Sequence, residues 1–193
     1  MAMKLKDKIL FNLITEIRKL GTEIIIPNYY VGSWEMDLFR LLDTGYLHEY
    51  EIKTSRADFK NDFKKSTHDV IYHRDKPFSE CLEKMNFRKK HEELESGKYV
   101  ANKFFFVVPE NLVSAEECPN YAGLIYFVED EYGRVFFKQE KPAKFIHKNK
   151  YDVDYKSICK SLSYREFGQR LKVRNLTAQN KEFKNNRKKI EKS

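Results

Sequence analysis

Disulfide-forming and turn-forming residues are scarce in this chain. Its 193 residues include three cysteines, seven glycines, five prolines and one tryptophan. Cys81, Cys118 and Cys159 lie far apart, form no CxxC motif and have no histidine at zinc spacing, so the sequence excludes a disulfide framework and a cysteine-based zinc site. The few glycines and prolines argue against a turn-dense sandwich or a low-complexity chain. We expect ordinary thiols in a reducing compartment.

Long apolar runs are also missing. The first 20 residues, MAMKLKDKILFNLITEIRKL, carry charged residues throughout, which is typical of neither a secretory signal peptide nor a membrane span. The sequence therefore predicts no membrane partner and a cytoplasmic location. It leaves the oligomeric state open, with a homodimer as one option.

Charged and aromatic residues are abundant instead. The chain is 41% hydrophobic, 34% charged and 15% aromatic, which is typical of a soluble globular protein with a substantial core. Lysine and arginine total 37 against 29 aspartates and glutamates, a net charge of +8. This balance favours polyanionic partners such as nucleic acid, because the positive charges neutralise phosphates, although many basic proteins bind none.

Hydrophobic periodicity predicts an α/β fold. Apolar residues recur at helical spacing over residues 5–20, which predicts an amphipathic helix. Two segments of alternating polarity, 34–42 and 46–55, flank the turn signal Asp43-Thr44-Gly45 and predict a β-hairpin. The further expected elements are an edge strand or a bend at 22–31, a helix over 55–71 capped by Ser55, a buried strand at 103–109, strands at 122–129 and 134–140, and a helix at 153–172. We therefore expect a central mixed β-sheet flanked by helices.

The composition predicts one domain over residues 1–173. Within it, the polar stretch 74–102 has the character of an insertion made of helix and loop. Residues 174–193 shift to Lys, Arg, Asn and Gln, so we expect a basic tail that is mobile or orders only on a partner. Its lysines are either a nucleic-acid-binding arm or a solubilising end.

One short constellation of residues carries chemistry. Asp37 lies on the first strand of the predicted hairpin, and Glu51-Ile52-Lys53 lies on the second. Residues two apart on a strand share a face, so Glu51 and Lys53 project together and the hairpin can bring Asp37 beside Glu51. Two carboxylates, a backbone carbonyl and water suit Mg²⁺ or Mn²⁺. A neighbouring lysine can orient an attacking water.

The pattern by itself is weak. A second Glu-x-Lys occurs at Glu182-Phe183-Lys184, in a segment with no strand pattern. The competing interpretation of the first motif is a solvated strand face whose charges form cross-strand ion pairs. The order of elements favours a site: a helix, a strand, a strand with Asp37, a strand with Glu51 and Lys53, a basic helix and a buried strand.

This order, together with EIKTSRADFKNDFKK (51–65), FFFVVPENLV (104–113) and CPNYAGLIYF (118–127), resembles the PD-(D/E)xK nuclease superfamily. Within it, the likeness is to the MmcB-like DNA repair proteins and related phage and bacterial proteins. The resemblance implies a restriction-endonuclease-like core, a divalent-metal site and a DNA substrate. The chain differs from the family at Glu35-Met36, where a basic residue is usual, and at Glu49, which adds a third acid to the strand face.

Carried over residue by residue, the resemblance makes Asp37 and Glu51 the metal carboxylates, joined by the carbonyl of Ile52, and makes Lys53 the catalytic lysine. It also implies an acid on the first helix, for which Glu16, at the border of the apolar stripe of that helix, is the best candidate. Three basic residues of the helix after the motif are expected either to contact phosphates or to remain solvated: Arg56, Lys60 and Lys64.

The predicted function is that of a Mg²⁺- or Mn²⁺-dependent DNA endonuclease, in DNA repair or in phage DNA processing. The alternative is a nucleic-acid-binding module that keeps the nuclease fold but does not cut. A third interpretation is a structural or interaction protein. Cleavage that Lys53→Ala or Asp37→Ala abolishes would distinguish the first from the others.

Overall fold

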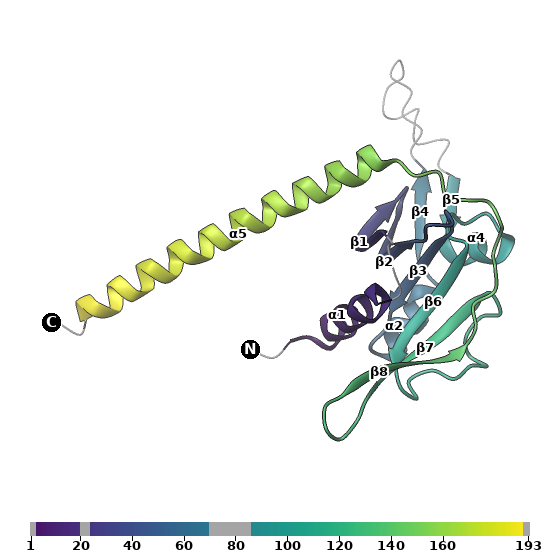
Figure 1. Cartoon of the computed structure of the whole chain (residues 1–193), viewed down its shortest axis with the longest axis horizontal. Helices are drawn as coiled ribbons and strands as arrows, with labels where there is room; N and C mark the ends of the chain where they lie inside the picture. The colour runs from purple at the N-terminus through teal and green to yellow at the C-terminus, as the bar shows by residue number, and fades with distance from the viewer. Residues whose placement is uncertain (1–2, 20–23, 70–85, 191–193) are drawn as a thin grey trace, which may run out of the picture. The chain divides into compact units, whose positions relative to one another are not determined.

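A six-stranded mixed sheet is the centre of the first of two units, residues 1–151 and 152–193, into which the chain divides. The computed structural model describes residues 3–19, 24–69 and 86–190. The strands of the sheet, in chain order, are β1 (Ile24–Val31), β2 (Trp34–Leu41), β3 (Leu47–Ile52), β6 (Lys103–Pro109), β7 (Ala122–Glu129) and β8 (Val135–Lys141), and they lie side by side in this order (Figure 1).

Both strand directions occur in this sheet. Strand β3 runs parallel to β6, and β6 runs parallel to β7. The remaining neighbours are antiparallel. The expected α/β class, with a central mixed sheet flanked by helices, is therefore confirmed, and β1 is an edge strand as expected.

The expected hairpin is formed by β2 and β3. Leu41 pairs with Leu47 and Leu38 pairs with Tyr50. The turn between the strands includes Gly45 at φ +82°, a left-handed conformation that glycine adopts without steric cost. The turn signal thus fixes the register, and the register decides which side chains share a face.

One face of the sheet is apolar and is covered by helix α1 (Leu5–Arg18). Ile9 and Leu13 of α1 are buried in one cluster with Leu38, Tyr50 and Ile52 of the hairpin. These positions follow the helical and the alternating spacing seen in the sequence. The opposite positions of β2 and β3 must therefore point to the other side of the sheet.

That other side is covered by two short helices, α2 (Arg56–Asp62) and α4 (Lys90–Ser96), with α1 and α2 on opposite sides of the sheet (Figure 1). Phe59 of α2 meets Phe106 of β6 edge to face at 4.8 Å between ring centroids. Ser55 caps α2, since its hydroxyl accepts from the amide of Asp58 at 3.1 Å, as expected. The acidic residues Asp37, Glu49 and Glu51 of the hairpin lie on this side of the sheet.

Helix α2 ends at Asp62, and residues 66–69 form strand β4 (Ser66–Asp69), so the helix expected over 55–71 is shorter than predicted. Of the stretch 74–102, which we expect to be insertion-like, residues 74–85 lie outside the described part of the chain. Strand β5 (Asn86–Lys89) pairs with β4 in a small two-stranded sheet, and α4 follows it directly. This segment supplies two buried side chains to the site described below.

The second unit contains helix α5 (Tyr155–Ile190), which has 36 residues. We expected a helix only over 153–172, within the first domain, followed by a mobile tail from 174. The helical backbone instead continues through that tail to Ile190, and the helix belongs to the second unit. Lys, Arg and Gln are good helix formers even without an apolar face, which is why a low content of core residues did not end the helix.

Among the described residues, no helix combines the length and the apolar character needed to cross a membrane.

Candidate functional site

The three residues singled out in the sequence line one pocket of about 360 Å³. The register that pairs Leu38 with Tyr50 sets Asp37 beside Glu51 on the neighbouring strand, and Lys53 directly follows β3. The rest of the pocket is lined by Lys6, Tyr30, Ser33, Trp34, Glu35, Asp58 and Lys65. The structure therefore brings together two carboxylates and an amine that lie up to 16 residues apart in the chain.

These three side chains are removed from solvent. The exposed fractions are 7% for Asp37, 1% for Glu51 and 3% for Lys53. A solvated strand face with cross-strand ion pairs, the competing interpretation of the sequence, is therefore wrong. Buried charges need partners to offset the cost of leaving water.

Glu51 is the centre of the cluster and is contacted by three lysines. Its Oε2 accepts from Lys53 at 3.0 Å, and Lys65 lies 3.2 Å from Oε1. Lys90 of α4 also donates to Oε1. Burial by itself would raise the pKa of Glu51, but Lys90 and then Lys53 and Lys65 overcome it and lower this pKa to about 2. Glu51 is an anion at every pH at which the chain is expected to work.

Lys53 lies between two carboxylates. Its ammonium donates to Glu51 at 3.0 Å and to Asp62 at 2.5 Å. Burial opposes the charged form, yet Glu51 and Asp62 together raise the pKa of Lys53 above its usual value. With its proton in place, Lys53 can orient a water or stabilise developing negative charge.

A chain of hydrogen bonds fixes Lys53 from behind. Asp62 contacts the Nε2 atom of His91 at 2.8 Å, and the Nδ1 atom of His91 lies 2.5 Å from the hydroxyl of Tyr121. Burial opposes ionisation of Asp62, but His91 and Lys53 hold its pKa well below the usual range. An ionised Asp62 can only accept, so Nε2 of His91 must carry a proton. Burial raises the pKa of Tyr121, so its hydroxyl keeps the proton that it can donate to Nδ1.

A buried lysine, Lys90, extends the cluster to a further acid of the hairpin, Glu49. Lys90, fully buried, contacts both Glu49 and Glu51. Burial raises the pKa of Glu49 to about 7, with Glu51 adding to the effect and Lys90 opposing it. The third acid noted in the sequence is thus a buried partner of Lys90, and Glu49 does not line the pocket.

Asp37 is oriented by the neighbouring strand. Its Oδ2 accepts from the backbone amide of Ile52 at 2.8 Å, and Lys6 of α1 lies 2.8 Å from Oδ1. Burial and then Glu51 raise the pKa of Asp37, against the opposing effect of Lys6. A cation placed between Asp37 and Glu51 would relieve their mutual repulsion.

The donor set fits a divalent cation with many water or phosphate ligands. Within the described ranges, no group of three or more His, Cys, Asp or Glu side chains is arranged to hold a metal. Asp37 and Glu51 offer two carboxylates, which is the number by which Mg²⁺ is commonly held when substrate phosphates and water complete its shell. The ammoniums of Lys6 and Lys65 now contact these carboxylates, and both side chains are partly exposed, at 45% and 39%. They are the cations that a metal would displace.

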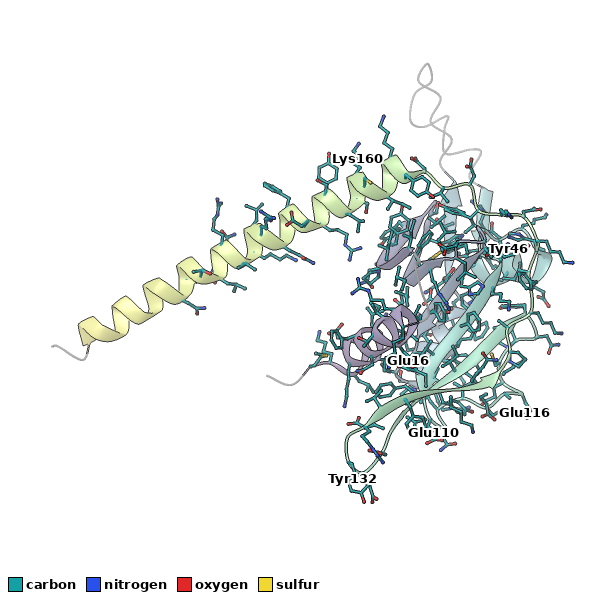
Figure 2. All side chains as sticks on the ribbon, viewed as in Figure 1. Glu16, Tyr46, Glu110, Glu116, Tyr132 and Lys160 are labelled. Carbon is teal, nitrogen blue, oxygen red and sulfur yellow. The ribbon has the colours of Figure 1, made fainter. Side chains whose placement is uncertain are left out.

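Glu16 does not belong to this site. It is exposed, pairs with Lys19 at 2.6 Å and lines a different pocket with Arg40 and His48 (Figure 2). Glu16 lies ten residues beyond Lys6 on α1, which is about 15 Å along a helix. The residue of the first helix that reaches this pocket is Lys6, and Glu16, the acid expected there, lies elsewhere.

The three basic residues expected near DNA have different environments. Arg56 donates to the carbonyl of Leu112 at 2.9 Å and pairs with Glu117, so it ties the start of α2 to a neighbouring loop. Lys60 and Lys64 are exposed. For Lys60 and Lys64, a contact with phosphate stays a prediction.

Sequence reasoning missed four residues of the cluster: Asp62, Lys65, Lys90 and His91. The first two lie inside EIKTSRADFKNDFKK, three residues apart on one side of α2 and its end, so helical spacing offered a signal. Lys90 and His91 lie some 40 residues beyond Glu51, in a polar segment. No local pattern marks them, because only the packing of α4 on the sheet brings them to Glu51.

Comparison with known proteins gives one structural likeness. The chain matches no protein-family model and no curated protein. It is similar to a solved structure of a protein of unknown function from Silicibacter pomeroyi, with a TM-score of 0.51 and 17% sequence identity over 89% of this chain and 91% of that one. At this identity the likeness concerns the fold.

Proposed function

We propose that the chain is a divalent-metal-dependent nuclease of the PD-(D/E)xK type that hydrolyses phosphodiester bonds in DNA. The observation that carries the proposal is the convergence of Asp37, Glu51 and Lys53 on one pocket through the register of a hairpin. A role in DNA repair or phage DNA processing, and a cytoplasmic location, belong to the same proposal.

The three residues divide two tasks. Asp37 and Glu51 would hold Mg²⁺ or Mn²⁺, with the carbonyl of Ile52 as a further ligand. When bound, the ion polarises the phosphate and lowers the pKa of a water ligand. Lys53, protonated between Glu51 and Asp62, orients the attacking water and stabilises the charge that develops on phosphorus-bound oxygens.

Lys6 and Lys65 have a task that follows from their position. Both line the pocket, both carry a partly exposed ammonium, and each contacts one of the two metal carboxylates. A cation held by those carboxylates would release Lys6 to pair with a phosphate. Lys65 would lose its contact with Glu51 and keep its closer contact with Asp62, at 2.7 Å.

A second candidate is a nucleic-acid-binding module that does not cut. Both oxygens of Glu51 are engaged by lysines, and both oxygens of Asp37 accept from Lys6 or Ile52. A pocket whose acids are already neutralised can bind a polyanion without metal. The two candidates share the fold and differ in whether the lysines give way.

The test is cleavage of supercoiled plasmid by the full chain, with Mg²⁺ or Mn²⁺ and with EDTA, in wild type and Asp37→Asn. Asparagine keeps the size of Asp37 and can still accept from the amide of Ile52, so this variant should fold. We expect metal-dependent nicking by wild type and a loss of about 10²-fold or more in Asp37→Asn. Asp43→Asn, at the other end of the same hairpin, is the matched control.

Three outcomes separate the candidates. Nicking that survives Asp37→Asn, or that is equal in EDTA, contradicts the proposed site. Wild type that binds DNA without nicking it favours the non-cutting module. Absence of binding at low salt, where phosphate contacts are strongest, excludes both and leaves a structural role.

A further inference from the structure

The positive charge of the chain is concentrated in its second unit. Residues 152–193 contain 12 lysines and arginines and 5 aspartates and glutamates, a net +7, out of +8 for the whole chain. Residues 1–151 contain 25 lysines and arginines and 24 aspartates and glutamates, a net charge of +1. The unit that carries the pocket is therefore almost neutral, and the general argument from basic charge to nucleic acid applies to α5.

Four exposed basic residues of α5 share one side of the helix. Lys156 and Arg174 are 18 residues apart, which is five full turns, so they project in the same direction. Lys160 and Arg170 lie four residues from these two and within about 40° of them. All four side chains are exposed, and Lys160 is labelled on α5 in Figure 2. We call these four residues the basic face of α5.

The apolar residues of α5 do not make a single stripe. Leu162 and Val173, exposed at 42% and 63%, project to one side of the helix. Tyr164 and Phe167, exposed at 67% and 61%, project to nearly the opposite side, next to the basic face. A helix that lies on a membrane surface needs one continuous apolar side, which α5 lacks. A row of cations without such an apolar side favours the phosphates of nucleic acid over a lipid surface.

We propose that the basic face of α5 is a DNA-binding surface, separate from the pocket, that docks on the phosphate backbone of duplex DNA. The basic face runs over 18 residues of this helix, from Lys156 to Arg174, which is about 27 Å and the axial length of about 8 base pairs. Its cations lie in a row on one side of α5, where they can reach successive phosphates of a duplex. This inference deepens the proposed function and rests on it for the identity of the partner.

The test measures binding of the full chain to a fluorescent 20-base-pair DNA duplex over a range of salt concentrations. EDTA is present throughout, so cleavage plays no part. The variant replaces Lys156, Lys160, Arg170 and Arg174 by glutamine, which has a similar helix propensity, and circular dichroism checks that α5 persists. We expect affinity at 50 mM salt to fall by about tenfold or more. The salt slope should become shallower by about 0.9 for each phosphate that the variant no longer neutralises.

The matched control removes the same four charges from the first unit. Lys98, Lys138, Lys144 and Lys148 are exposed and lie outside the pocket, and their replacement by glutamine should change affinity by less than about threefold. Equal losses in both quadruple variants would show that net charge alone acts, and would overturn the proposal. So would unchanged binding in the α5 variant, or a wild type that binds phosphatidylserine vesicles and not the duplex.

The outcomes for α5 and for the pocket are distinguishable. A wild type that binds through α5 but never nicks DNA overturns the nuclease and leaves the surface standing. If the α5 variant nicks plasmid and binds the duplex as well as wild type does, the α5 surface is overturned and the nuclease is left standing.

Discussion

The two units of this chain hold the same kind of side chain in opposite environments. In the first, Lys53 and Lys90 are buried and fixed among carboxylates. In the second, Lys156 and Lys160 are exposed along α5. A buried ammonium persists only where geometry offsets its desolvation, whereas an exposed one contributes little to stability. The comparison indicates that the buried charges build a site and the exposed charges remain available to a partner.

The largest expected difference between the two units concerns Lys90. Lys90→Met should destabilise the chain by about 3–5 kcal/mol, because it leaves Glu49 and Glu51 buried without their shared ammonium. Urea unfolding followed by fluorescence measures the change. The control is Lys160→Met on α5, for which we expect less than about 0.5 kcal/mol. Similar costs for the two variants would remove the contrast between the units.

The acid side of the stability profile should depend on Glu51. The lysines lower its folded-state pKa from 4.5 to about 2, so its stabilisation is complete above pH 4.5 and is lost as the pH falls toward 2. The loss is on the order of 3 kcal/mol. Burial raises the pKa of Glu49 to about 7. Glu49 therefore makes the free energy of unfolding fall as the pH rises from 4.5 to 7, the opposite of the effect of Glu51.

Unfolding free energies of wild type and Glu51→Gln should therefore be compared below pH 4.5. Asp62, whose pKa is also held low, contributes a loss of stability to both proteins there, so the difference between the two profiles reports on Glu51. Wild type should lose stability more steeply than the variant. Parallel profiles would mean that Glu51 is not held as an anion by its three lysines.

The hydrogen-bond chain behind Lys53 should show graded effects on cleavage. Asp62→Asn removes the charge that holds Lys53 on one side, and we expect kcat for plasmid nicking to fall by about 10²-fold. Tyr121→Phe removes only the last hydrogen bond, to His91, and should cost less than about tenfold. Duplex binding in EDTA should hardly change in either variant. If Tyr121→Phe had a larger effect than Asp62→Asn, these hydrogen bonds would not act on cleavage through Lys53.

The smallest effect is expected at Glu16, an exposed acid of the first unit. Glu16→Gln should leave nicking and stability within about twofold and 0.5 kcal/mol of wild type, because its partner is Lys19 and its pocket is not that of Asp37. A tenfold loss of nicking would return Glu16 to the site and would show that exposed charges contribute to catalysis here.

Local signals were sufficient for the framework of the fold. Leu5, Ile9, Leu13 and Ile17 indicated the period of α1, Gly45 marked the turn between β2 and β3, and the run at 103–109 marked a buried strand. They were insufficient for the end of α5, because a helix of Lys, Arg and Gln needs no apolar face to persist. The low content of core residues was a poor guide to where that helix ends.

The site, like the fold, has residues that local signals predict and residues that they do not. Asp37, Glu51 and Lys53 were predicted to converge because a hairpin couples two strands through one turn. Glu16 was chosen for its place at the edge of an apolar stripe, which says which side of a helix faces the sheet but not which turn of it approaches the pocket. Lys6, nearer the start of α1, is the residue that does so.

The sequence by itself determined the alternation that sets the carboxylates of the hairpin on one face of the sheet, since strand period and turn position are local properties. Only the tertiary structure decided that Asp62, Lys90 and His91 would close over them. Those residues arrive on helices packed against that face, and helix packing depends on apolar contacts such as Phe59 with Phe106. Charge neutralisation in a buried pocket is therefore a property of the assembled fold and not of any one segment.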